Sequence, residues 1–209
     1  MLIGIGGSAA NPTHLGHLVL LKHLVLSGIF QKVVWMPSGI REDKKGFAAP
    51  EHRVRMTQLA VANLAKFFHE KIELLFDDAY GKNHPTIWWL KKFQKENPQD
   101  TIAWYTGVDS VVSEEKYGGK CEIEARWVSG KELMRDWKFI VVPRKGFPDP
   151  RELSLPKQFE VLNVDISDEV CIKSSDIRDL IAGGRPFEHL VTANVADYIK
   201  ANGLYGYRG

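Results

Sequence analysis

Short apolar runs alternate with helical patterns along almost the whole chain, and this alternation constrains the fold more than any other feature. The runs are mostly too continuously apolar for strands with one exposed face. They cover residues 2–5, 32–36, 71–76, 101–106, 138–142 and 160–164. Apolar periodicity predicts helices over residues 15–27, 51–68, 86–96, 130–136, 174–182 and 187–202. We therefore predict an α/β fold, a Rossmann-like parallel sheet flanked by helices, with a C-terminal helical segment.

Composition limits the class of protein. The 209 residues, 44% of them hydrophobic, suffice for a substantial core, so we predict a single domain over 1–209 with its C-terminal helical part from about 172. A formal net charge of +2 argues against an extended nucleic-acid surface. Cys121 and Cys171 lack metal-ligand spacing and are predicted to be reduced thiols. With no signal peptide or membrane-length stretch in view, we expect a cytoplasmic protein that binds neither nucleic acid nor membrane.

A glycine-rich turn joins the first predicted strand to the first predicted helix. It reads Gly6-Gly7-Ser8-Ala9-Ala10-Asn11-Pro12-Thr13-His14-Leu15-Gly16-His17. Glycines let a backbone approach a ligand closely, and a helix N-terminus attracts anions. His14 and His17 share a helix face if the first helical turn includes both. Neither the P-loop ending nor the third glycine of the dinucleotide fingerprint is present. The pattern favours phosphoryl or nucleotidyl transfer over a turn whose histidines merely cap a helix.

Polar segments follow three further strands, at the edge where parallel sheets bind ligands. Residues 37–46 form a basic loop suited to an anionic substrate, although a solvated charge cluster is equally compatible. Asp109 follows the fourth strand, where a carboxylate can accept hydrogen bonds from ribose or cap a helix. In the segment after the third strand, Trp88 and Trp89 would point about 100° apart on a helix, so one can be part of the core while the other lines a pocket.

Two helix segments carry further charged candidates. Arg53 and Arg55 are spaced so that at most one faces the core. The segment 172–178 places hydroxyls at a helix start and Arg178 one turn later, which is either a second anion site or a serine N-cap with a solvated arginine. Because the first turn is also a candidate anion site at a helix start, we favour the interpretation in which the two helix starts converge on one polyphosphate.

The His-x-Gly-His arrangement resembles the signature of the nucleotidyltransferase superfamily with a HIGH-type motif. Almost end to end, the chain further resembles bacterial-type nicotinate-nucleotide adenylyltransferases, whose first element reads Gly-Gly-x-Phe-Asp-Pro-x-His-x-Gly-His. The other matching elements, in family order, are Pro37 with its basic loop, Gly107-Val108-Asp109-Ser110, Trp127, Val142-Pro143-Arg144, Ser174-Ser175-Asp176-Ile177-Arg178, and the tail from Val195-Ala196-Asp197-Tyr198-Ile199 to Asn202-Gly203-Leu204-Tyr205.

This resemblance implies transfer of the adenylyl group of ATP to nicotinate mononucleotide, giving deamido-NAD and pyrophosphate in NAD biosynthesis. Mg²⁺ would accompany ATP, bound through phosphate oxygens and water rather than through protein ligands. The implied catalytic residues are His14, His17 and Arg178. The implied ATP-binding residues are Gly7, Ser8, Gly16, Ser174 and Ser175. The implied substrate-binding residues are Lys44, Lys45, Thr86, Gly107, Asp109 and Trp127.

The chain also departs from that family. The first turn is one residue longer and lacks the phenylalanine and aspartate, residues 85–90 match the family's Tyr-Thr-x-x-Thr-Leu only at Thr86, and residues 116–126 look like an insertion. Alternatives are therefore nicotinamide mononucleotide as acceptor, or another adenylyltransferase such as pantetheine-phosphate adenylyltransferase, although that family is shorter. Length and the lack of a lysine-rich second signature disfavour a class I aminoacyl-tRNA synthetase. A catalytically silent nucleotide-binding module is the non-enzyme alternative.

Overall fold

The structure is a computed structural model that describes residues 1–39, 46–68, 70–164 and 172–209. Its main sheet has the strand order β3-β2-β1-β4-β7-β8, and the pairs β1·β4, β4·β7 and β7·β8 are parallel. The predicted α/β fold with a Rossmann-like parallel sheet is thus confirmed. The strands are β1 (Leu2–Ser8), β2 (Lys32–Pro37), β3 (Ile72–Leu74), β4 (Thr101–Gly107), β7 (Lys138–Val142) and β8 (Phe159–Val161).

Helices separate these strands, as the sequence pattern predicts. A two-stranded antiparallel sheet is formed by β5 (Ser113–Glu114) and β6 (Lys120–Cys121). Within the described ranges, none of the helices has the length and apolar character needed to cross a membrane. The helices are α1 (Leu15–Leu26), α2 (Pro50–Phe68), α3 (Asp77–Tyr80), α4 (Thr86–Glu96), α5 (Glu122–Arg126), α6 (Gly130–Asp136), α7 (Ser174–Ala182) and α8 (Ala193–Ala201).

The bounds of several predicted elements differ from those in the structure; the first strand, expected over 2–5, runs to Ser8. The helix expected over 187–202 is a 3₁₀ turn, Glu188–Leu190, followed by α8. Between them Val191 and Thr192 are extended, with ψ of 171° and 154°, as suits β-branched residues. The strand expected over 71–76 shortens to β3 because α3 begins at Asp77. The strand expected over 160–164 begins earlier, at Phe159, and ends at Val161.

The chain forms two compact units, and β1 and β2 each run from the first into the second. The first unit comprises residues 1–6, 23–34 and 84–171, and the second comprises residues 7–22, 35–83 and 172–209. Residues 40–45, 69 and 165–171 within these ranges lie outside the described part of the chain.

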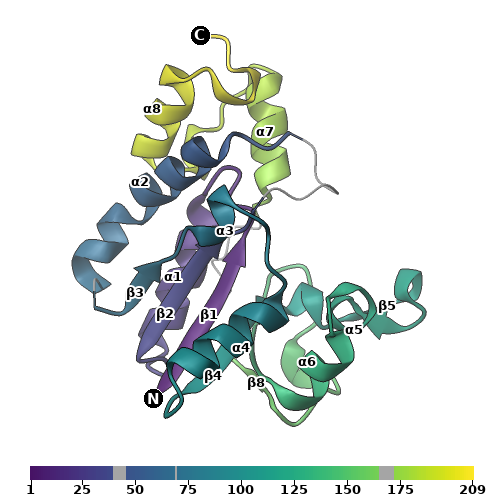
Figure 1. The fold of residues 1–209 in the computed structure, drawn as a ribbon. Coiled ribbons are helices and arrows are strands. Elements are labelled where there is room, and N and C mark those ends of the chain that lie inside the picture. The colour runs from purple at the N-terminus through teal and green to yellow at the C-terminus, as the bar shows by residue number, and fades with distance from the viewer. Residues whose placement is uncertain (40–45, 69, 165–171) are drawn as a thin grey trace. The chain divides into compact units, whose positions relative to one another are not determined.

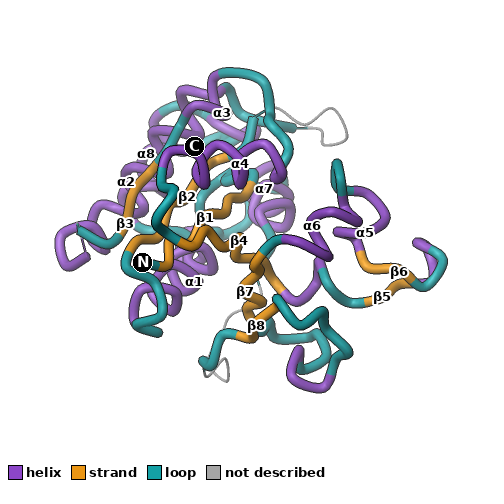
Figure 2. The backbone as a smooth tube through the Cα atoms, turned by 60° about the horizontal axis from the view of Figure 1, so that its bottom comes forward, coloured by secondary structure: helices purple, strands orange, loops and turns teal. Residues whose placement is uncertain are grey.

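The first unit is built on β4, which pairs with β1 on one side and β7 on the other (Figure 2). Tyr105 of β4 is buried, and its hydroxyl donates to the carbonyls of Gly6 and Val34, at 3.3 and 3.0 Å. Burial raises the pKa of this phenol, so it stays a donor. Phe139 and Ile140 of β7 are fully buried, which marks the centre of this unit's core.

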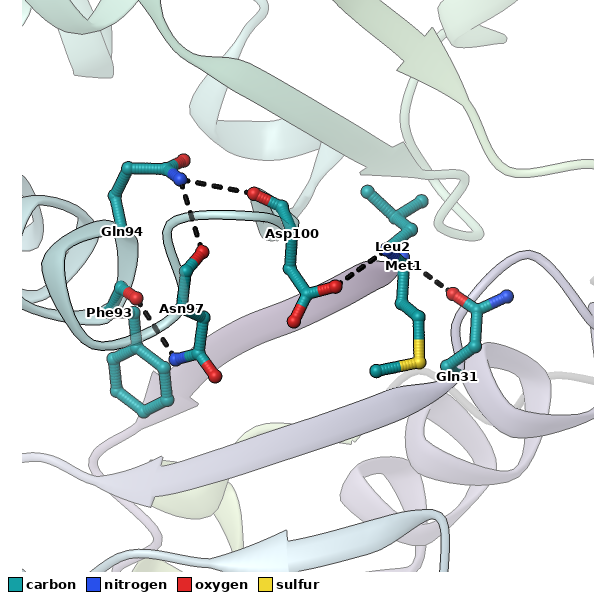
Figure 3. Close-up of polar contacts among 7 residues, drawn as sticks. All are labelled: Met1, Leu2, Gln31, Phe93, Gln94, Asn97 and Asp100. Carbon is teal, nitrogen blue, oxygen red and sulfur yellow. Dashed lines mark hydrogen bonds and ion pairs between the residues drawn. The ribbon is translucent and has the colours of Figure 1, made fainter.

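Polar contacts at one end of β1 and β4 support their pairing (Figure 3). The ammonium group of Met1 lies 2.6 Å from Asp100 Oδ1, and Thr101 N donates to Met1 O at 2.8 Å. Gln94 of α4 donates to the carbonyls of Asn97 and Asp100, which closes the turn from α4 into β4. These contacts hold Leu2 opposite Thr101, which is the first residue pair in the parallel register of β1 and β4.

The second unit packs α7 and α8 against α2 (Figure 1). Met56 of α2, Ile177 of α7, and Val195 and Ile199 of α8 are fully buried in one apolar cluster. Burying each such side chain stabilises the fold by about 1.5–3 kcal/mol. The predicted C-terminal helical segment therefore belongs to the core of this unit, where it can hold the residues at the start of α7 in place.

Candidate active site

The turn after β1 begins with a close approach of two backbones. A Cβ atom on Gly7 would lie 2.0 Å from the carbonyl oxygen of Met36, so only glycine fits there. Ser38 N then donates to Ser8 O at 2.8 Å, which extends the contact between the two segments. The glycine that the sequence suggested for ligand approach is thus needed for chain packing, and its contact with ATP stays a prediction.

The structure brings His14 and His17 together at the start of α1. The helix begins at Leu15, so His14 precedes the helix rather than sharing a face with His17 within it. The two residues bond reciprocally: His17 N donates to His14 O at 3.0 Å, and His14 N donates to His17 Nδ1 at 3.2 Å. The ring centroids are 3.8 Å apart. This reciprocal pairing caps the helix and fixes the orientation of the His17 ring.

The backbone also selects the tautomer of His17. Because Nδ1 accepts the N–H of His14, the neutral ring carries its hydrogen on Nε2. Nε2 lies 3.0 Å from Ser8 Oγ, which also accepts the N–H of Ala10 at 3.2 Å. Ser8 Oγ therefore receives two hydrogen bonds, and its own hydrogen can be donated to an oxygen of a ligand. In this arrangement the Ser8 hydroxyl is the donor that the pair can direct to an anion, while the His17 Nε2–H is bonded to Ser8 Oγ.

The start of α7 lies against the same turn, within the same unit. Ser174 Oγ donates to Pro12 O at 3.1 Å, and Arg178 Nη1 donates to Asn11 O at 2.8 Å. The N-cap of α7 is Lys173, so the alternative of a serine N-cap is wrong. Ser175, by contrast, is exposed and bonds to Asp176. The two helix starts therefore meet, while their contact with a polyphosphate stays a prediction.

Arg53 of α2 is fully buried beneath the turn, whereas Arg55 is exposed, which confirms that at most one of them faces the core. Its guanidinium donates to three carbonyls, Ser38 O at 2.6 Å, Ala9 O at 3.1 Å and Ala79 O at 3.4 Å. Burial lowers the pKa of Arg53.

The sequence pattern predicts no role in the site for Arg53. The sequence nevertheless contained a signal for it. On the buried face of α2, the residues at positions i, i+3, i+4 and i+7 are apolar or small except for this arginine, which stands at position i. A buried cation at such a position implies several acceptors around it.

A second group of predicted residues lies in the first unit, at the end of β4. A Cβ on Gly107 would lie 2.3 Å from Asp109 Oδ1, so the glycine leaves room for that carboxylate. Asp109 sits inside a 3₁₀ turn, Val108–Ser110, and makes no capping bond, so the N-cap alternative is wrong. Instead, Arg144 Nη1 donates to Asp109 Oδ2 at 3.3 Å. The arginine holds the carboxylate at the strand end.

The first unit also contains the aromatic candidates and Thr86. Trp127 follows α5, is half-buried, and packs edge-on against Trp104 at 6.3 Å. Thr86 is the first residue of α4. Of the adjacent tryptophans on that helix, Trp89 is buried and Trp88 is exposed, so one is core, as predicted. The exposed Trp88 ring stacks on His84 at 4.0 Å.

Lys44, Lys45 and Cys171 lie outside the described residues.

Gly16 lies in the first turn of α1, where an added Cβ would meet the His14 ring at 3.1 Å. In the described ranges, no three His, Cys, Asp or Glu side chains are grouped to hold a metal ion.

Comparison with known proteins identifies the family. A family profile described as cytidylyltransferase-like matches residues 5–180. Probable nicotinate-nucleotide adenylyltransferases of Carboxydothermus hydrogenoformans and Leifsonia xyli are 32% and 30% identical, over 97% of this chain and 97% and 93% of their own.

Structural comparison agrees on the fold. A Plasmodium falciparum nicotinic acid mononucleotide adenylyltransferase, solved in complex with NaAD, superposes with a TM-score of 0.82 at 22% identity, covering 99% of this chain and 98% of that one. The chain belongs to the cytidylyltransferase-like family and, within it, to the nicotinate-nucleotide adenylyltransferases.

Proposed function

We propose that this chain transfers the adenylyl group of ATP to nicotinate mononucleotide, forming deamido-NAD and pyrophosphate. The observation that carries the proposal is the meeting of two helix starts in one unit, with His17, Ser174 and Arg178 around the turn after β1. The names of the full-length relatives support the same reaction. We place the reaction in the cytoplasm, where reduced thiols such as the free, buried Cys121 persist.

The chemistry is a displacement at phosphorus. A phosphate oxygen of nicotinate mononucleotide attacks the α-phosphorus of ATP, and the bond from that phosphorus to the bridging oxygen breaks. Pyrophosphate leaves with the electron pair. The nucleophile is already an anion, so no strong general base is required. Catalysis must align two anions and stabilise the charge that grows on the leaving group.

The described donors fit those tasks. His17 carries its hydrogen on Nε2 without having to be protonated, because His14 N–H occupies Nδ1. The Nε2–H bonds to Ser8 Oγ in the structure, and the proposal has it exchange that partner for ATP: we assign it, together with Arg178, to the oxygens of the α- and β-phosphates, where charge develops. Ser8 and Ser174 complete the ATP contacts, and the free N–H groups at the helix starts add their dipoles. His14, 6% exposed, mainly orients His17.

Magnesium enters the proposal with ATP. The donors around the turn are imidazole, guanidinium and hydroxyl groups, which fit phosphate oxygens rather than the ion itself. Mg²⁺ prefers oxygen ligands from phosphate and water. When bound, the ion neutralises part of the charge on the leaving pyrophosphate.

We assign the mononucleotide to groups that include those at the end of β4. Asp109, held by Arg144, would accept hydrogen bonds from a ribose, and Trp127 would stack near the pyridine ring. The proposal gives Thr86 a contact with the substituent of that ring, and Lys44 or Lys45 a contact with the mononucleotide phosphate.

Acceptor preference tests the proposal directly. Pyrophosphate release from ATP is measured with nicotinate mononucleotide, nicotinamide mononucleotide and phosphopantetheine as parallel acceptors. We expect nicotinate mononucleotide to give the highest kcat/KM. A preference for the amide would keep the chemistry and overturn the specificity. Nucleotide binding without pyrophosphate release from any acceptor would favour the catalytically silent module.

The Asp109–Arg144 pair gives a second prediction. Arg144→Gln should raise the KM for the nucleotide whose ribose Asp109 binds by up to about fivefold, because a freed carboxylate must be ordered again at a cost of about 1 kcal/mol. We expect kcat and thermal stability to change little, since both partners are about one-third exposed. Steady-state kinetics with each substrate varied in turn measures the effect.

Arg151→Gln is the matched control for this variant. Arg151 also pairs with an aspartate, Asp149, at 2.9 Å in the same unit, but it lies in a 3₁₀ turn to which we assign no substrate contact. Equal KM values for Arg144→Gln and Arg151→Gln would remove Arg144 from the proposal.

A further inference from the structure

The side chain of Asn11 is held by three hydrogen bonds to two segments of the second unit, the stretch before α2 and the turn that contains Tyr205. It is 1% exposed. Its Nδ2 donates to Gly46 O at 2.9 Å, and its Oδ1 accepts from Ala48 N at 3.0 Å and from the Tyr205 hydroxyl at 2.8 Å. A carbonyl can only accept and an amide N–H can only donate, so the orientation of the Asn11 amide is unambiguous.

The backbone next to this amide supports the proposed triphosphate site. Asn11 O accepts from Arg178 Nη1, and Pro12 O accepts from Ser174 Oγ. Both carbonyls therefore hold residues that the proposed function assigns to ATP. Any shift of the Asn11 side chain would move the carbonyls that position Arg178 and Ser174.

Tyr205 reaches Asn11 from the C-terminal tail, 194 positions along the chain. It lies in a 3₁₀ turn, Leu204–Gly206, in a left-handed conformation with φ 59° and ψ 24°. That conformation is strained for a residue other than glycine. Burial raises the pKa of the Tyr205 phenol, so the hydroxyl keeps its hydrogen. The left-handed backbone of Tyr205 and the burial of its phenol together place a hydrogen-bond donor, the Tyr205 hydroxyl, at Asn11 Oδ1.

We propose that Tyr205 is a positioning residue for the ATP site: its hydroxyl fixes the Asn11 amide, and the adjoining carbonyls hold Arg178 and Ser174 in their working geometry. This inference rests on the proposed function, because it assigns a task to residues of the same site. It makes the last residues of the chain part of the nucleotide-binding apparatus.

The direct test is Tyr205→Phe, which removes one hydroxyl and keeps the ring. We expect kcat/KM for ATP to fall about five- to tenfold, the equivalent of one hydrogen bond, while the KM for the mononucleotide changes less than about twofold. Calorimetry should give an ATP affinity weakened by a similar factor. A purely structural role would leave both ATP parameters unchanged once the protein is folded.

Tyr198→Phe is the matched control. The hydroxyl of Tyr198 also joins a C-terminal helix to the body of the same unit, through a 2.9 Å contact with His52 Nδ1 on α2, but it does not touch the turn. Both variants lose one tyrosine hydroxyl of the C-terminal region. Equal ATP parameters for Tyr198→Phe and Tyr205→Phe would overturn the inference.

A double-mutant cycle isolates the coupling. In an Asn11→Ala background the Tyr205 hydroxyl has no amide to hold, so adding Tyr205→Phe should change kcat/KM for ATP by less than about twofold. If the two substitutions lowered kcat/KM for ATP independently, so that their fold-changes multiplied in the double variant, the inference would be contradicted. Asn11→Asp should be worse than Tyr205→Phe, because a carboxylate oxygen would replace the donor that faces Gly46 O.

The two proposals fail in different ways. If the unaltered protein binds ATP but releases no pyrophosphate with any acceptor, the proposed function fails, and calorimetric affinities of the same variants still test the role of Tyr205. If turnover occurs but Tyr205→Phe matches the unaltered protein, only the role of Tyr205 is overturned. If neither ATP nor pyrophosphate binds the unaltered protein, both are overturned.

Discussion

Replacing His17 with asparagine is expected to lower kcat for pyrophosphate release by about 10²- to 10³-fold, the usual effect of losing one donor at a centre of developing charge. The asparagine oxygen can stand in for Nδ1 and accept His14 N–H, so the helix cap survives. The donor at the Nε2 position is lost. Single-turnover measurements with saturating ATP separate this loss from weaker binding.

His17→Gln is the informative companion, because a glutamine amide nitrogen can lie where Nε2 lies. It should retain more activity than His17→Asn, since it keeps a donor near Ser8. His23→Asn is the control for a histidine elsewhere on α1, and we expect its kcat within about twofold of the unaltered protein. If His17→Asn behaved like His23→Asn, His17 would have no part in stabilising the transition state.

Local sequence signals predicted much of the fold. The bounds predicted for α4, α6, β7 and α7 are those of the structure. Pro85 precedes α4, Asn97 and Pro98 follow it, and Gly183 ends α7, so the ends of these helices were marked in the sequence. Prediction failed around Val191, where the extended backbone divides one apolar periodic stretch into two elements.

The segment 116–126 shows what family resemblance leaves open. From the sequence it is recognisable only as an insertion. In the structure it contains β6 and α5, and α5 packs against α6 and the turn that carries Asp109. Ile123 of α5 is fully buried. The segment therefore supports the end of β4, a packing relation that no local spacing could have predicted.

Within the candidate site, the predictable residues are those that share one local motif. His14 and His17 are three residues apart at the start of one helix, and Ser174 and Arg178 are one helical turn apart, so their proximity follows from their short spacing in the sequence. Asn11 and Tyr205, or Asp109 and Arg144, meet only through the tertiary fold. Polar side chains that act at such a distance in the chain leave no periodic signal.

Replacing Arg53 with methionine should destabilise the protein by at least about 3 kcal/mol, because the carbonyls of Ala9, Ser38 and Ala79 would lose their donor in a buried place. Methionine keeps the volume of the arginine stem, so the loss reflects hydrogen bonding rather than a cavity. For a chain of this length, that corresponds to a fall in Tm of roughly 6–12 °C. Thermal unfolding followed by circular dichroism measures it.

Arg55→Met separates this effect from a loss of charge on α2. Arg55 is exposed two residues further along the same helix, and its replacement should change stability by less than about 0.5 kcal/mol. Arg53→Lys should fall between the two, because an ammonium group cannot reproduce the planar fork that serves three carbonyls. Similar Tm values for Arg53→Met and Arg55→Met would mean that the segments after β1, β2 and β3 are held by other contacts. A fall confined to Arg53→Met would show that one buried guanidinium joins the three segments that follow β1, β2 and β3.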